Sequence, residues 1–447
     1  MKLVYGIKDR PKFGQVLVFA LQQLLAILAA TIAVPTIVGN GMSVSAALFG
    51  AGVGTIVYLL FTKFNSPVFL GSSFAFIGSM FAAFAGAAST AAGYMGIIIG
   101  AIFAGLVYVA IALVVKFVGV EWVNKLMPAV VIGPTVSIIG LSLAGNAVGD
   151  LTVGKVLDAE GKSLCNPYVA LICGLVTLFV VIITSVYGKK MAKLIPFIIG
   201  ILAGYSVAAV FTVIGISTDN TALQVINFEA FKNLSLFSVP EFTFLTGLKA
   251  VKEIDAQYII TLAVAYVPVA FVVFAEHIAD HKNLSSIIDK DLLKEPGLHR
   301  TLLGDGVGSM VGAFFGGCPN TTYGESVGCV AITGNASIVT ILATAVLAII
   351  ISFFGPFVTF LASIPNCVMG GVCITLYGFI AVSGLKMIQK VDLNANKNLF
   401  VVAVILICGI GGLTLTFGKV TLTSIATALI IGIIVNLMVS RKKESEE

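Results

Sequence analysis

The stretch CPNTTYGES at Cys318–Ser326 decides how this chain folds. It lies between two apolar segments, yet it combines proline, glycine and several small polar residues, which form helices poorly. Non-helical backbone at membrane depth is tolerated only where it is buried in protein or lines a cavity. The stretch therefore predicts a short extended segment, followed by a half-helix, inside a membrane-embedded protein.

The composition also indicates a membrane protein. The chain has 447 residues, of which 58% are hydrophobic and 11% are charged, whereas soluble domains are about a quarter charged. Apolar runs of the roughly 20 residues that a helix needs to cross a bilayer recur along the whole chain. The run from about Val16 to Val38 is too long for the apolar part of a signal peptide, so it is expected to be the first span. We expect a polytopic α-helical membrane protein without a soluble domain.

The apolar runs predict about fourteen spans, and the distribution of basic residues favours this number. The expected centres are near residues 27, 53, 77, 104, 135, 176, 204, 266, 307, 327, 348, 376, 406 and 430. Lysine and arginine concentrate on the cytoplasmic side of membrane proteins. With both termini in the cytoplasm, only six of the 26 basic residues fall outside: Lys155, Lys162, Lys232, Lys249, Lys252 and Lys419.

Two pairs of segments indicate an internal repeat. SPVFLGSSF at Ser66–Phe74 resembles Cys318–Ser326, and MPAVVIG at Met127–Gly133 resembles IPNCVMG at Ile364–Gly370. Each pair is seven spans apart, an odd number, so the two copies cross the membrane in opposite directions. Inverted repeats with interrupted helices at matching positions are typical of secondary transporters, whose substrate site lies near the midplane.

Two acidic residues lie where a membrane chain tolerates them least. Glu276 follows a long apolar run, within FAEHIAD at Phe274–Asp280, and Glu325 closes the broken segment. A carboxylate at membrane depth costs about 3 kcal/mol even on mild insertion scales. Such residues bind a ligand, line a wet cavity or carry a proton. From the residues alone, an interfacial Glu276 paired with His277 or Lys282 stays an alternative.

The sequence offers little for other chemistry. The seven cysteines form no Cys-x-x-Cys pair, and the three histidines form no metal-binding cluster. No phosphate-binding glycine loop and no His-Glu-x-x-His motif occur. We therefore expect no enzyme, no cofactor and no nucleic-acid partner. His277 and His281 are expected to be solvated, Asp305 to lie at a helix end, and the glycines at 308, 312 and 316 to form a packing face.

Four segments together resemble the nucleobase–ascorbate transporter family, with its uracil-transporting bacterial branch as the nearest match. They are FAEHIAD, EPGLHR at Glu295–Arg300, Pro319–Gly328 and Pro365–Gly384. The resemblance implies fourteen spans as two inverted repeats of seven, with short antiparallel strands in spans 3 and 10. It implies a core domain (residues 1–119 and 251–362), a gate domain (120–216 and 363–440), an extracellular loop (217–250), a cytoplasmic tail (441–447) and a possible homodimer through the gate domain.

The resemblance also assigns the site. It implies that Glu276, Glu325, Phe74 and the backbone at Tyr323 and Gly324 contact uracil. Ala30, Ser73 and Tyr377 are implied neighbours. Carboxylates accept hydrogen bonds strongly from ring N–H groups, and an aromatic ring at position 74 stacks on the base. Glu276 is our first choice for the proton-coupling group. Asp280, one helical turn further on, is expected to share the proton or to orient Glu276.

The implied function is uracil–proton symport by alternating access across the cytoplasmic membrane, with uracil, protons and the lipid bilayer as partners. One departure concerns Asp280, because some uracil-transporting members have histidine there and purine-transporting relatives have aspartate. A xanthine or uric acid symporter is therefore the alternative within the family. A channel, an intramembrane enzyme and an anion transporter are the alternatives outside it.

Overall fold

The computed structural model describes residues 3–119, 122, 128–158, 160, 162–189, 191–232, 234–417 and 420–440. The expected tail at 441–447 and Met127, the first residue of one repeat copy, lie outside the described residues.

The first half of the chain is helical apart from one short strand. Its elements are α1 (Phe13–Val38), α2 (Val44–Phe61), β1 (Leu70–Ser72), η1 (Phe74–Phe76), α3 (Ile77–Ala85), α4 (Thr90–Val118), α6 (Ala129–Ser142), α7 (Ala144–Asp150), α8 (Pro167–Tyr187), α9 (Met191–Leu194) and α10 (Pro196–Ser217). A connecting region follows, with η2 (Thr221–Leu223), η3 (Phe228–Phe231), α11 (Thr243–Gly247) and η4 (Leu248–Glu253).

The second half repeats this order and ends in a hairpin and a helix. Its elements are α12 (Ala256–Ile288), η5 (Leu293–Gly297), α13 (Leu298–Gly316), β2 (Asn320–Thr322), α14 (Gly324–Thr333), α15 (Ile338–Ile351), α16 (Gly355–Ser363), α17 (Asn366–Ile388), α18 (Asn396–Ile410), β3 (Leu415–Phe417), β4 (Val420–Leu422) and α19 (Ser424–Ser440).

These helices account for the expected spans. Among the described residues, eight helices are long and apolar enough to cross a membrane, and four shorter apolar segments accompany them. Helices α13 and α14 complete fourteen, and every expected centre falls within one of these segments. The expected fold, two inverted repeats of seven spans with short strands in spans 3 and 10, is confirmed.

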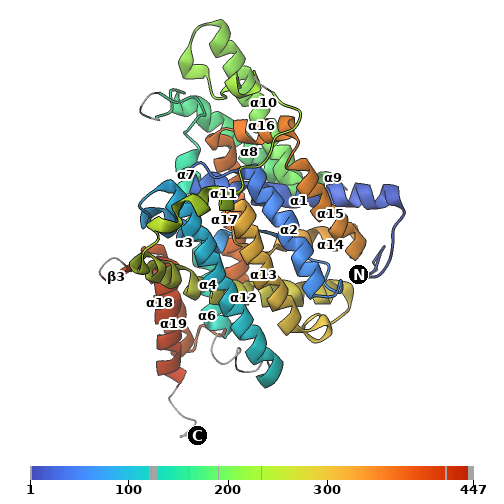
Figure 1. The fold of residues 1–447 in the computed structure, drawn as a ribbon, viewed down its shortest axis with the longest axis vertical. Helices are drawn as coiled ribbons and strands as arrows, with labels where there is room; N and C mark the ends of the chain where they lie inside the picture. Colours follow the sequence, from blue (N-terminus) through green and yellow to red (C-terminus); the bar gives the residue numbers. More distant parts are fainter. Residues whose placement is uncertain are drawn as a thin grey trace.

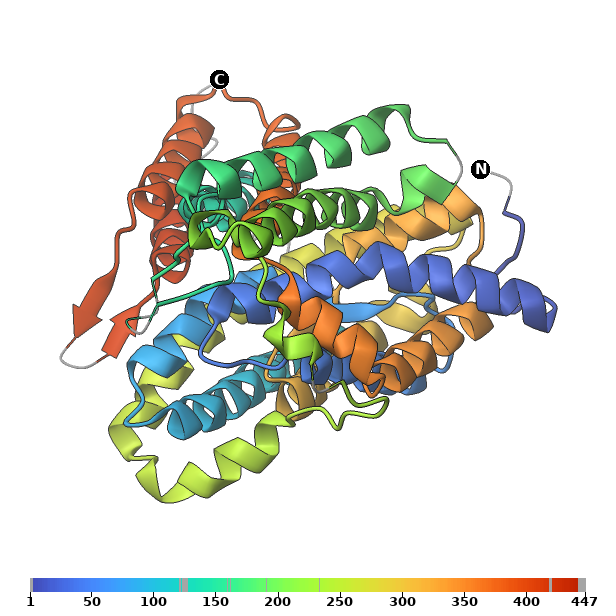
Figure 2. The same cartoon turned by 90° about the horizontal axis from the view of Figure 1, so that it is seen from above.

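The two broken segments pair with each other in the interior. Strands β1 and β2 are antiparallel and fully buried, with Leu70 opposite Thr322; Figure 2 shows helices on all sides of this pair. Neighbouring side chains satisfy the backbone nearby, because Leu70 N donates to Thr55 Oγ1 (2.9 Å) and Phe69 N donates to Ser326 Oγ (3.1 Å). Buried backbone polar groups need such partners, so strand pairing makes the helix breaks tolerable.

The second pair of repeat copies also matches in structure. Helix α6 begins directly after Pro128 and helix α17 directly after Pro365, and each proline is the N-cap in extended conformation. Proline fits this place because the first helical turn does not need its N–H. The two helices then pack against each other.

The helices, which are labelled in Figure 1, pack as two groups. We call α1–α4 with α12–α15 the first group, and α6–α8, α10 and α17–α19 the second group. Helices α2 and α13 cross closely within the first group, since a Cβ built at Gly308 would lie 2.9 Å from the carbonyl oxygen of Gly54. The predicted glycine packing face is confirmed.

Candidate substrate site

A cavity of about 330 Å³ lies between the two groups and collects three acidic side chains. Glu276 and Asp280 come from α12, and Glu325 comes from the first turn of α14. The second group supplies a mostly apolar wall. The lining residues from that wall are Val136, Phe197, Leu376, Phe379, Ile380, Ser383 and Met387. The cavity therefore offers acceptors on one side and apolar surface on the other, as sites for small molecules usually do.

The pairing of β1 with β2 explains why Glu325 reaches the cavity. Tyr323 is the N-cap of α14, so the helix starts at Gly324 and presents its first-turn N–H groups together with the Glu325 side chain. Such N–H groups have no partner within the helix, and they favour negative charge or carbonyl oxygens nearby. A Cβ built at Gly324 would lie 3.8 Å from Asp280 Oδ1, which places this helix end beside α12.

No described basic residue neutralises the three carboxyl groups of the cavity. The ion pairs within the described part of the chain are Lys232–Glu229, His277–Asp305 and Lys294–Asp291. Several uncompensated buried carboxylates would cost several kcal/mol each. Carboxyl groups arranged in this way can take up protons or bind a ligand that donates hydrogen bonds.

Asp280 is held by the broken segment. The Thr322 hydroxyl donates a hydrogen bond of 2.7 Å to Asp280 Oδ2. This bond fixes one carboxylate oxygen and leaves the other toward Gly324. Thr322 was not among the residues predicted from the sequence, although it lies within the stretch that decides the fold.

The remaining predicted residues are not part of the cavity lining. The rings of Phe74 and Tyr377 meet edge to face, with centroids 5.9 Å apart, and so join η1 to α17 across the two groups. Tyr323 donates its hydroxyl to the backbone oxygen of Ser72 (2.8 Å) and covers β1 at Gly71. Ala30 and Ser73 are buried, and the Ser73 hydroxyl has no hydrogen-bond partner among the described residues.

The expectation that His277 and His281 are solvated is wrong, and so is the helix-end position of Asp305. All three side chains are fully buried. His277 Nδ1 lies 2.7 Å from Asp305 Oδ2, in the interior of α13, and His281 Nε2 lies 2.7 Å from the Tyr58 hydroxyl on α2. These histidines follow the end of the apolar run in the sequence, whereas helix α12 continues beyond that run to Ile288.

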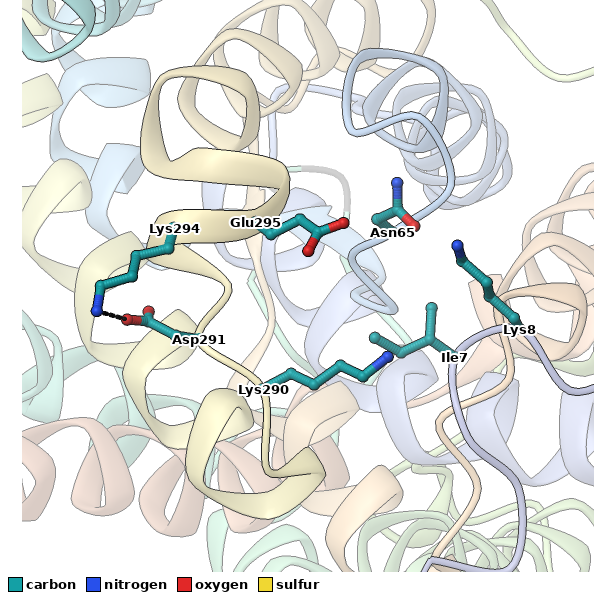
Figure 3. A pocket seen from close by; sticks show the side chains of 7 residues that line it. All are labelled: Ile7, Lys8, Asn65, Lys290, Asp291, Lys294 and Glu295. Carbon is teal, nitrogen blue, oxygen red and sulfur yellow. Dashed lines mark ion pairs between the residues drawn. The ribbon is translucent and has the colours of Figure 1, made fainter.

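A second cavity, of about 300 Å³, lies at the end of α12 and differs in character (Figure 3). Lys8, Lys290 and Lys294 surround it together with Asp291 and Glu295. Lys294 and Asp291 form an ion pair at 3.6 Å. None of the predicted site residues lines this charged cavity, so the cavity between the helix groups is the candidate substrate site.

Residues 14–418 match the permease family Xan_ur_permease. The chain belongs to this family. Similar proteins include a uracil permease of Bacillus caldolyticus, 40% identical over 100% of this chain and 97% of its own length. The uracil permease of Escherichia coli strain K12 is 34% identical, over 97% of this chain and 93% of the relative. The protein is therefore a multi-pass membrane permease and not an enzyme.

Solved structures with a similar fold have low sequence identity. The transmembrane domain of the cyanobacterial bicarbonate transporter BicA has a TM-score of 0.65 at 16% identity, with 96% of this chain and 99% of that chain covered. SLC26A9 has a TM-score of 0.67 at 12% identity and covers 96% of this chain and 66% of that chain. These similarities support the fold and say nothing about the substrate.

Proposed function

We propose that this permease transports uracil together with protons by alternating access. The observation that carries the proposal is the single cavity that brings Glu276, Asp280 and Glu325 against the apolar wall of the second helix group. The uracil permeases that resemble the whole chain support the choice of substrate.

Uracil complements this cavity chemically. Its two ring N–H groups are donors for carboxylates, and hydrogen bonds to a charged acceptor are the stronger kind. Its two carbonyl oxygens are acceptors for the N–H groups at the start of α14. Phe74, whose ring meets that of Tyr377 on α17 edge to face, is proposed to stack on the base. Tyr323, Gly324, Ser73, Ala30 and Tyr377 complete the proposed binding site.

Proton coupling follows from the excess of carboxyl groups. Burial and a second nearby carboxylate both favour the protonated form of a carboxyl group. One proton shared between Glu276 and Asp280 would leave an ionised oxygen to accept an N–H group of the base. Transport would then require that the first helix group moves past the second, and the cavity already lies at their boundary.

We propose that the chain lies in the cytoplasmic membrane with both termini in the cytoplasm. The proton gradient across that membrane would drive uptake. The first helix group corresponds to the proposed core domain (residues 1–119 and 251–362) and the second to the gate domain (120–216 and 363–440). A homodimer through the gate domain stays a prediction, which cross-linking in the membrane would test.

Uptake of labelled uracil into proteoliposomes tests the proposal. We expect saturable uptake that an inward proton gradient accelerates and a protonophore abolishes. Glu276→Gln and Glu325→Gln should each lower uptake at least about 100-fold, since each removes a charged acceptor worth about 3 kcal/mol. Glu241→Gln is the matched control, because Glu241 is exposed in the connecting region.

Three results would overturn the proposal. Normal proton-driven uptake by both cavity variants would remove the carboxylates from the mechanism. Displacement of the label by xanthine and not by unlabelled uracil would assign the site to purines. Uptake that neither saturates nor depends on the proton gradient would indicate a channel.

A further inference from the structure

Helix α12 presents two chemically different faces. Glu276 and Asp280, four residues apart, line the cavity. His277 and His281, also four residues apart, are fully buried against α13 and α2. Each residue of an α-helix is rotated about 100° from the previous one. The two histidines therefore form a face of α12 next to the face that carries the two carboxyl groups. The proposed function does not use this second face.

The hydrogen bonds of His281 match a neutral ring. Its Nδ1 donates to the backbone oxygen of His277 at 2.8 Å, since a carbonyl oxygen only accepts. In a neutral ring its Nε2 accepts from the Tyr58 hydroxyl at 2.7 Å, and the Ser66 hydroxyl, 2.7 Å from the Tyr58 oxygen, can donate to it in turn. A neutral imidazole has one donor and one acceptor. Every partner of His281 is thus satisfied without a charge.

His277 has a different set of partners, which allows two arrangements. Its Nδ1 lies 2.7 Å from Asp305 Oδ2, and its Nε2 lies 2.9 Å from Thr301 Oγ1. Thr301 Oγ1 also lies 3.1 Å from the backbone oxygen of Leu298. A threonine hydroxyl has one proton to donate and can accept two hydrogen bonds. The direction in which the Thr301 hydroxyl donates therefore decides whether Nε2 of His277 can carry a proton.

In the first arrangement, Thr301 donates to Leu298 and accepts from Nε2–H of His277. A further proton then occupies the bond between Nδ1 and Asp305, and the three side chains together are neutral. In the second arrangement, the Thr301 hydroxyl turns and donates to Nε2. Nδ1–H then donates to the ionised Asp305, and the group carries one negative charge. The two arrangements differ by one proton, and each keeps both contacts of His277.

We propose that His277, Thr301 and Asp305 form a second proton-loading site beside the substrate cavity. This inference rests on the proposed proton-coupled function. A proton held in this group would leave Glu276 ionised and free to accept an N–H group of the substrate. Thr301 and His277 do not line the cavity. They are positioning residues, because they set the charge of Asp305, which in turn affects the ionisation of Glu276.

The surroundings of His277, Thr301 and Asp305 allow this group to be either neutral or negatively charged. Among the described residues, the titratable groups near it are Glu276, Asp280 and His281 on α12, Tyr58 on α2 and Tyr108 on α4. The second oxygen of Asp305 and the Tyr108 hydroxyl are buried without a hydrogen-bond partner among the described residues. An ionised Asp305 therefore depends on His277, while the nearby carboxyl groups repel its charge.

The chain contains three histidines, so nitrogen NMR can test the inference directly. The unmodified protein would be labelled with ¹⁵N-histidine in nanodiscs and titrated with pH, and His281→Gln and His299→Gln would assign the signals. We expect His281 to keep its proton on Nδ1 at every pH. His277 should carry a proton on Nε2 at low pH and lose it at high pH. A single protonation state of His277 throughout would overturn the inference, whether or not transport is proton-coupled.

Uptake by two Thr301 variants tests the functional part. Thr301→Ser keeps the hydroxyl and should retain the pH profile of uracil uptake. Thr301→Val removes the hydrogen-bond partner of Nε2 in both arrangements. The arrangement with the extra proton loses more, because a hydrogen bond donated by a charged ring is stronger than one made by a neutral ring. The profile should therefore move about one pH unit lower. Uracil affinity at low pH should change less than about twofold. An unchanged profile for a folded Thr301→Val protein would overturn the inference, whereas proton-independent uptake by the unmodified protein would refute the proposed function itself.

Discussion

Thr322 Oγ1 donates a hydrogen bond of 2.7 Å to Asp280 Oδ2, and this bond ties strand β2 to helix α12 beside the cavity. Thr322 also lies opposite Leu70 in the antiparallel pair of strands β1 and β2. The position of an acidic side chain in the proposed site thus depends on a contact between two segments that are 42 residues apart.

Thr322→Val should weaken transport. The variant keeps the size of the side chain but removes the donor to Asp280, and a hydrogen bond to a charged group contributes about 1.5 kcal/mol. We expect about tenfold slower uracil uptake, measured in proteoliposomes. Thr333→Val is the matched control, since its hydroxyl donates to the backbone oxygen of Cys329 within the same helix. Equal losses in both variants would contradict the prediction.

Ser326→Ala should destabilise the paired strands β1 and β2. The Ser326 hydroxyl accepts from Gln23 Nε2 at 2.5 Å and from Phe69 N at 3.1 Å, and both donors are buried. Without it, each donor loses its acceptor at a cost of about 1–3 kcal/mol. We expect a lower midpoint of thermal unfolding for the purified protein. Ser286→Ala, at an exposed position of α12, should leave the midpoint unchanged.

Gly308→Ala should disturb the crossing of α2 and α13. The added Cβ would lie 2.7 Å from the Leu70 side chain and 2.9 Å from the Gly54 carbonyl oxygen, so the helices would have to separate. Overpacking of this kind costs about 1–3 kcal/mol. We expect reduced yield of folded protein by fluorescence-detected gel filtration. Gly14→Ala, where a Cβ would meet no atom within 4 Å, is the control; a wild-type yield for Gly308→Ala would refute the close crossing.

Cys165, in the segment between α7 and α8, should resist alkylation. Burial raises the pKa of the Cys165 thiol to about 11. A raised pKa keeps the thiol protonated at neutral pH, and maleimides react with the thiolate. We expect slow labelling of the native protein that accelerates only near that pH or on denaturation, with the labelled cysteine identified by mass spectrometry. Fast labelling at neutral pH would contradict the buried position.

The spans and the site were unequally predictable from the sequence. The run of apolar residues and the odd spacing of the repeat copies are local patterns, and both led to the correct fold. The glutamates at 276 and 325 were noticeable because a carboxylate stands out in apolar sequence. His277, His281 and Asp305 were misplaced, because nothing in the local sequence shows that α12 and α13 bring them together in the interior.

The sequence by itself determined which backbone must be helical, where it must break, and that two acidic residues lie at membrane depth. These features follow from composition and spacing along the chain. Only the tertiary structure decided the register in which the two breaks pair, that Thr322 holds Asp280, and that Asp305 faces His277 and not the cavity. Such contacts join distant segments, and their geometry depends on how helices rotate and cross, which no single stretch of sequence encodes.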